Sequence, residues 1–176
     1  MGSAVGGSGQ PAGSYAGEFA AHAQFLLTDE NIEEVEDFAI EPGRPSSLEE
    51  YVNTVAQQIS AGEAEAARFA EGYASVLQFG RPTWSVAAFV EQGRVFETLA
   101  RAVLNTPFAM PADLQRQMRA LDEFAREDIR IQVEDRIRMV LDERVRPIEC
   151  LAVARYALAA RAARATEEPI NPRPIS

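Results

Sequence analysis

The sequence predicts an all-α protein built of antiparallel helical hairpins, arranged as an array or a bundle, with one long helix and extended termini. Apolar residues recur every three or four positions through most of the 176-residue chain, which is the spacing of one helix face. The composition is rich in Ala, Glu, Arg and Leu, all good helix formers. The hydrophobic fraction of 47% is sufficient for one substantial core. We therefore expect a single helical domain over residues 15–166.

The two ends of the chain differ in composition from the middle. Residues 1–14 are mostly glycine and serine, and ordering them would cost more conformational entropy than they could recover. Residues 167–176 contain Pro169, Pro172 and Pro174, which favour an extended backbone. We expect a flexible segment at the N-terminus and an extended, proline-rich tail at the C-terminus.

The first helix is expected over residues 15–27. Its apolar residues recur at helical spacing: Phe19, Ala20, Ala23, Leu26 and Leu27. Thr28-Asp29 can cap a short second helix with the stripe Ile32, Val35, Phe38 and Ala39. His22, the only histidine, lies in the first helix. Because a His-rich metal site needs a second imidazole, we expect His22 to have a structural role at the surface or in a hydrogen bond.

A helical hairpin is expected over residues 48–79. Ser47 and Glu50 have the spacing of a capping box directly ahead of an apolar pattern. The segment 60–63, which contains Gly62, is predicted to end the first helix of the pair and to begin the second. Two helices joined by so few residues should lie antiparallel.

The next helix, residues 84–104 after a Thr83 N-cap, should lie at the centre of the bundle, because apolar residues cover much of its circumference. It contains the only tryptophan, Trp84, and a glycine in its middle, Gly93. A residue without a side chain there would let a neighbouring helix approach closely. We therefore ascribe Trp84 and Gly93 to helix packing rather than to a ligand site.

One long helix is expected from Pro111 to about residue 144, since neither glycine nor proline interrupts that stretch, and it would be about 50 Å long. Residues 128–134 alternate as a strand would, but no second strand is available and we expect helix. Pro147 is predicted to break the chain before a last helix over residues 148–165. Cys150 is expected to be a small core residue.

The motif Phe89-x-x-Gln92-Gly93-x-x-Phe96 resembles the first helix of a tetratricopeptide repeat, although Gln92 stands where that repeat has a leucine. In the preceding segment, Tyr51, Gly62 and Ala67 resemble the first aromatic residue, the turn glycine and the small residue of the second helix.

Residues 48–165 also resemble the helical region of large tetratricopeptide-type proteins from myxobacteria and their relatives. This resemblance implies a bacterial helical array that serves protein–protein assembly. It would act in the cytoplasm or, if a signal has been removed, in the periplasm or cell envelope. The resemblance implies no catalysis.

The charge of the chain excludes some partners. A formal net charge of −10 argues against nucleic acid as the main ligand. Residues 1–100 carry 4 Arg and 15 acids, a balance of −11, whereas residues 101–176 carry 13 Arg and 12 acids, a balance of +1. The acidic half could attract a basic partner or the other half of a neighbouring copy, or it could be an ordinary solvated face. No apolar run reaches the roughly 18 residues of a membrane helix, so we expect no direct membrane span.

The sequence offers little chemistry for catalysis. One cysteine, one histidine and the absence of a phosphate loop or nucleophile elbow predict no catalytic, cofactor-binding or metal-binding residues and no cofactor. Nothing indicates a small-molecule ligand. The leading hypothesis is a non-catalytic helical scaffold or assembly subunit that binds protein partners in a larger complex. Two alternatives stay open: a self-assembling structural subunit, and a carboxylate-dependent enzyme whose acids converge only on folding.

Overall fold

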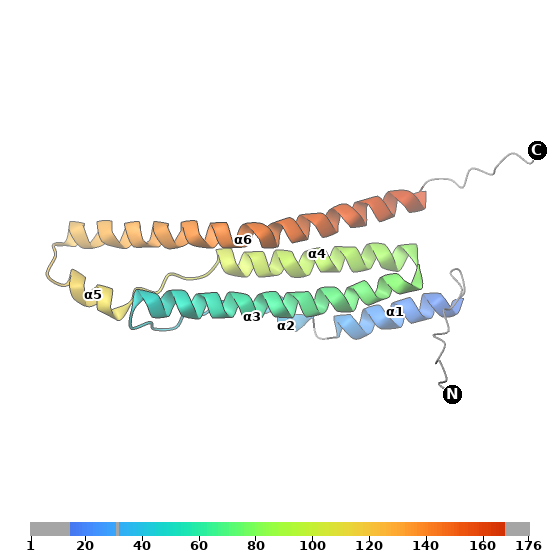
Figure 1. Ribbon diagram of the computed structural model, residues 1–176, viewed down its shortest axis with the longest axis horizontal. Coiled ribbons are helices and arrows are strands. Elements are labelled where there is room, and N and C mark those ends of the chain that lie inside the picture. The colour runs from blue at the N-terminus through green and yellow to red at the C-terminus, as the bar shows by residue number, and fades with distance from the viewer. Residues whose placement is uncertain (1–14, 31, 168–176) are drawn as a thin grey trace, which may run out of the picture.

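The computed structural model describes residues 15–30 and 32–167, and all regular secondary structure in these residues is helical (Figure 1). The all-α prediction is therefore confirmed, and residues 128–134 are helical despite their strand-like alternation. In chain order the elements are α1 (Tyr15–Asp29), α2 (Glu33–Glu36), α3 (Leu48–Ala74), the 3₁₀ helix η1 (Ser75–Phe79), α4 (Pro82–Leu104), α5 (Ala112–Met118) and α6 (Glu123–Glu167). The flexible segment expected over 1–14, and the extended tail apart from its first residue, lie outside the described residues.

Three long helices dominate the structure, with α4 running between α3 and α6 and antiparallel to both (Figure 1). The most extensive packing joins α4 to α6, followed by α3 to α4. Helix α1 packs against α3 and η1, and α2 contacts α3 and α4. The central position predicted for residues 84–104 is thereby confirmed.

The core follows the face of α4 that the sequence predicts. Its fully or almost fully buried apolar residues are Ala88, Val95, Leu99, Ala100 and Val103. Tyr51 and Tyr73 of α3 contribute the largest buried side chains of the neighbouring helix. Trp84, at the start of α4, is only half-buried, because it lies where the short α1 covers the first turns of α4.

The break expected at residues 60–63 is wrong, because α3 is continuous from Leu48 to Ala74. Gly62 is a buried residue of this helix rather than a turn. A Cβ atom at Gly62 would lie 2.7 Å from Leu99 of α4 and 2.8 Å from the Phe38 ring. Glycine therefore permits close packing here, which offsets its cost of about 1 kcal/mol inside a helix. Ala67 is exposed, so it does not occupy a small-residue packing position.

The predicted start of α3 is confirmed with one difference. The Ser47 side chain accepts a hydrogen bond from the backbone N–H of Glu50 at 3.1 Å, as an N-cap does. The Glu50 carboxylate, however, accepts from the backbone N–H of Ser46 at 2.6 Å and from the Ser46 hydroxyl. Because Ser46 donates two hydrogen bonds to this carboxylate, the pKa of Glu50 is lowered.

Two boundaries near the N-terminal half also differ from expectation. Thr28 does not cap a second helix, because its hydroxyl donates to the Gln24 carbonyl at 3.0 Å and α1 continues to Asp29. Only the single turn Glu33–Glu36 follows as α2. Helix α4 begins at Pro82 instead of after Thr83. Proline is favoured at a first helical position since its missing N–H needs no partner there.

The prediction of one long helix over residues 111–144 is wrong at both ends. The chain forms the short α5, turns, and begins α6 at Glu123. The Asp122 carboxylate accepts a hydrogen bond from the backbone N–H of Ala125 at 2.9 Å, which caps the new helix. The backbone N–H groups of Ala112 and Asp113 donate to the carbonyls of Pro45 and Ser46. The first turn of α5 is therefore held beside the start of α3.

The break expected at Pro147 is also wrong, because α6 continues through this residue to Glu167. Val145 and Ile148, on either side of the proline, are each only 3% exposed and belong to the core. Packing against α4 therefore offsets the hydrogen bond that proline cannot donate. Cys150, expected in the core, is exposed, because it lies on the outer side of this continuous helix.

We predict that Gly93→Leu destabilises the protein by about 1–3 kcal/mol or more, because a larger side chain overpacks a tight contact. A Cβ atom at Gly93 would lie 2.7 Å from the Tyr156 ring of α6. Ala67→Leu on the exposed side of α3 is the matched control and should change stability by less than about 0.5 kcal/mol. Chemical denaturation followed by circular dichroism measures both. Equal stability of Gly93→Leu and wild type would contradict the close α4–α6 packing.

We predict that Pro147→Ala increases the free energy of unfolding by about 1–3 kcal/mol, since it restores a backbone donor inside a continuous helix. Ala154→Pro, one heptad further along the same side of α6, should cost about 3 kcal/mol. Thermal denaturation of the two variants beside wild type makes the comparison. A loss of stability in Pro147→Ala would show that the proline is required for the path of the chain.

Candidate interaction surfaces

A cluster of aromatic residues joins α1 to the start of α4. The His22 ring stacks on Trp84 with their centroids 4.4 Å apart and their planes 16° apart. Trp84 Nε1 donates to the Glu18 carboxylate at 2.7 Å, and Phe25 packs at 5.5 Å from Trp84. His22 thus has the structural surface role that its isolation in the sequence predicts, and Trp84 serves helix packing.

Two polar side chains, Tyr73 and Gln92, are buried next to this aromatic cluster. The Tyr73 hydroxyl donates to Asp29 at 2.8 Å, and burial together with that hydrogen bond raises the pKa of Tyr73. Gln92 is 1% exposed and donates from Nε2 to the Ala70 carbonyl at 2.8 Å. Gln92 stands where the tetratricopeptide motif has leucine, and here it ties α4 to the backbone of α3.

Glu91 lies among other charges next to this polar group. Burial raises the pKa of its carboxyl, the nearby Asp29 and Glu36 raise it further, and Arg94 opposes them. Arg94 forms ion pairs with Glu36 at 2.5 Å and with Glu91 at 3.6 Å. Glu36 and Glu91 thus share one arginine, and Asp29 is held by the Tyr73 hydroxyl. No group of three or more His, Cys, Asp or Glu in the described part of the chain is placed to hold a metal ion.

An apolar groove lies between the N-terminal half of α3 and the middle of α6, with a volume of about 500 Å³. Its floor includes Tyr51, whose hydroxyl donates to the Pro107 carbonyl at 3.3 Å. An ion pair joins the two helices, with 3.0 Å between Arg144 Nη2 and Glu63 Oε2. Its principal apolar residues are Leu48, Val52, Val55, Ala56, Ile59, Ile137, Val140 and Leu141.

The first half of α6 projects past the end of α4 (Figure 1). Residues 123–140 include no buried residue, and the first buried residue of the helix is Leu141. At 1.5 Å per residue this projecting segment is about 27 Å long. Its exposed large apolar side chains include Phe124 and Ile131, with exposed fractions of 89% and 46%.

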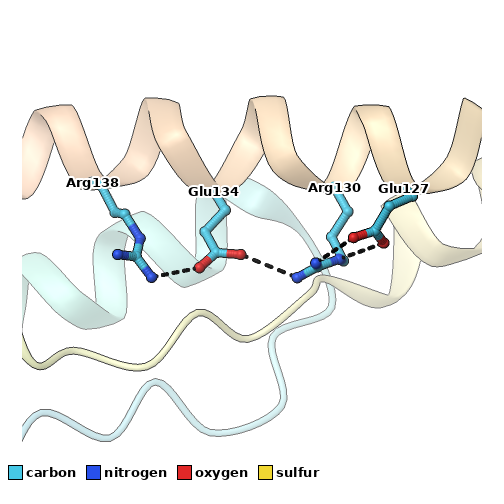
Figure 2. Close-up of polar contacts among 4 residues, drawn as sticks. All are labelled: Glu127, Arg130, Glu134 and Arg138. Atoms are coloured by element: carbon cyan, nitrogen blue, oxygen red, sulfur yellow. Dashed lines mark hydrogen bonds and ion pairs between the residues drawn. The ribbon is translucent and has the colours of Figure 1, made fainter.

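A row of charges runs along one side of this projecting segment, as Figure 2 shows. Arg130 donates to both carboxylate oxygens of Glu127, at 2.6 and 2.9 Å, and to Glu134 at 3.2 Å. Arg138 donates to the other oxygen of Glu134 at 2.7 Å. The hydrogen bonds from Arg130 lower the pKa of Glu127. Side chains three or four residues apart on a helix can stabilise it without tertiary contacts.

The outer side of α1 carries another exposed apolar surface. Gly17 and Ala21 are buried against the rest of the protein and Phe25 packs on the core, whereas the other large apolar residues of the helix face away from it. The exposed residues are Tyr15, Phe19, Leu26 and Leu27. The stripe from which the sequence predicts this helix therefore does not belong to the core. Its small inward residues, Gly17 and Ala21, were the only signal in the sequence that α1 could pack by its other side.

Comparison with models of known protein families, with curated proteins and with solved structures gives no match for this chain. Among the residues that the structure describes, no helix combines the length and the hydropathy that a membrane crossing requires. The sequence predicts no individual site residue. The groove and the outer side of α1 are surfaces that only the packing of the helices reveals.

We predict that Glu91→Gln raises the melting temperature at pH 7. The pKa of the Glu91 carboxyl is higher in the folded than in the unfolded chain, so its ionised form opposes folding. This penalty is absent below the unfolded pKa of about 4.3, where the carboxyl is protonated in both states. The gain should therefore disappear as the pH falls to that value.

The control for this prediction is Glu71→Gln, which removes an exposed carboxylate from α3. It should leave the melting temperature almost unchanged across the same pH range. A Glu91→Gln variant that is less stable than wild type at pH 7 would show that the ion pair with Arg94 outweighs the burial of the charge.

Proposed function

We propose that this protein is a non-catalytic helical scaffold, an assembly subunit that holds protein partners in a larger complex. The observation that carries the proposal is the projecting segment of α6, residues 123–140, in which no residue is buried. This segment runs past the end of α4, so its exposed sides, which carry Phe124 and Ile131, are available to other chains. The resemblance of Phe89, Gly93 and Phe96 to a tetratricopeptide motif supports the same class of function from the sequence.

The chemistry of the projecting segment suits protein recognition. Phe124 and Ile131 are seven residues apart and so lie on about the same side of the helix. The Glu127–Arg138 row of alternating charge runs directly beside these two residues, since Arg138 is seven residues beyond Ile131. Aromatic and aliphatic anchors beside paired charges are typical of surfaces that bind a partner helix.

The proposal is tested by capture of partners from a native lysate with tagged wild-type protein and with the double variant Phe124→Ser/Ile131→Ser. We expect wild type to recover specific proteins, identified by mass spectrometry, and the double variant to lose at least one of them severalfold. Val153→Ser is the matched control, because Val153 is 66% exposed on the half of α6 that packs on α4. It should recover the same proteins as wild type.

Circular dichroism must show equal helix content in all three proteins, so that a loss of binding reports on the surface. Recovery of wild type alone, as a monomer with no other protein, would contradict the scaffold proposal. Recovery of the same partners by the double variant would contradict a role of Phe124 and Ile131 in binding them.

A further inference from the structure

The outer side of α1 exposes more apolar area than is usual for a surface that contacts only water. Tyr15, Phe19, Leu26 and Leu27 are exposed to 88%, 72%, 53% and 65%. An aromatic side chain contributes about 150–250 Å², so these four residues expose on the order of 500 Å². Apolar patches above a few hundred Å² mark interaction sites. A standard interface buries about 800 Å² on each partner, and this side of α1 could supply most of that area.

The groove between α3 and α6 is the concave counterpart on the same chain. Leu48, Val52 and Ala56 line it from α3, and Ile137 and Val140 line it from α6. Val52 and Val140 remain 48% and 55% exposed. A groove between two helices with such a lining fits the apolar side of a third helix.

Helix α1 cannot fill the groove of its own chain. Thr28 of α1 packs against Gly72, and Asp29 accepts the hydrogen bond from Tyr73. Tyr73 lies about 20 Å along α3 from Ile59, the nearest groove residue of that helix, at 1.5 Å per residue. An α1 helix that occupies the groove must therefore come from a second copy of the chain.

Charge favours a second copy of this chain over an anionic membrane. Residues 15–30 contain Glu18, Asp29 and Glu30 and no Arg or Lys. Helices that lie on anionic membranes are rich in basic residues. The α6 wall of the groove carries Arg136, Glu143 and Arg144. Arg144 is paired with Glu63, whereas Arg136 forms no ion pair within the described residues. Glu18 and Asp29 are engaged with Trp84 and Tyr73 of their own chain, so Glu30 is the acid of this segment that can meet Arg136 of a second copy.

We propose that the outer side of α1 of one copy docks in the groove between α3 and α6 of a second copy. This inference deepens the proposed assembly function, because it names the chain itself as one partner and assigns both surfaces. The contact joins two different surfaces, so it builds either a reciprocal dimer or a longer head-to-tail assembly.

The test uses single-cysteine variants in a Cys150→Ser background. Leu26→Cys marks α1 and Val140→Cys marks the groove, and the two variants are mixed and treated with a short bis-maleimide. We expect a product that joins residue 26 to residue 140 in the mixture. Met139→Cys replaces Val140→Cys as the matched control. Met139 is 56% exposed but does not line the groove, and it should give no such product.

Light scattering over a range of protein concentrations gives a second, independent readout. Leu26→Glu and Val140→Glu should each raise the dissociation constant for self-association at least tenfold, while Met139→Glu should leave it unchanged. Equal helix content by circular dichroism shows that the variants fold. Sensitivity to Leu26→Glu alone, with cross-links only between two copies of residue 26, would overturn the inference in favour of an α1–α1 contact.

A wild type that stays monomeric at every concentration would also overturn it. Binding of that monomer to phosphatidylcholine vesicles, lost in Leu26→Glu, would assign the outer side of α1 to a lipid surface instead. Neither result affects the capture of other proteins through Phe124 and Ile131, which do not line the groove. Failure of self-association and failure of the scaffold proposal are therefore distinguishable.

Discussion

The close approach of α4 to both of its neighbours is the contact on which the rest of the structure depends. It is made possible by two glycines, Gly62 on α3 and Gly93 on α4, where any side chain would overlap Leu99 or Tyr156. At the second position the Tyr156 hydroxyl donates to Glu97 at 2.6 Å. Burial and this carboxylate raise the pKa of Tyr156 to about 12, so the hydroxyl stays a donor at neutral pH.

That contact also explains how α6 can continue past the end of α4. The half of α6 from Leu141 onward is held against α4 by Val145, Ile148 and Ala152. Extending a helix that is already formed avoids the cost of nucleation. The ion pairs between residues 127 and 138 are largely solvent-exposed and add only a small further stabilisation. The exposed sides of this segment remain available for contacts.

Helix α1 packs through the small residues Gly17 and Ala21 together with Phe25, and it exposes its other large apolar side chains. Gly17 and Ala21 are buried, and Trp84, with His22 stacked on it, joins the helix to α4. Large apolar side chains would normally supply the core. Their exposure on the outer side of α1 connects the packing of the monomer with its proposed assembly.

The sequence alone determined the helical class, the central role of residues 84–104 and the cap at Ser47, because apolar periodicity and capping act over a few neighbouring residues. It did not determine the continuity of α3 through Gly62 or of α6 through Pro147. Nor did it determine which side of α1 faces inward, or the groove. Those features depend on contacts such as Leu99 with Gly62 and the core around Val145 and Ile148. Only the tertiary structure decides them, because the packing energy of distant residues outweighs the local preference of glycine and proline to end a helix.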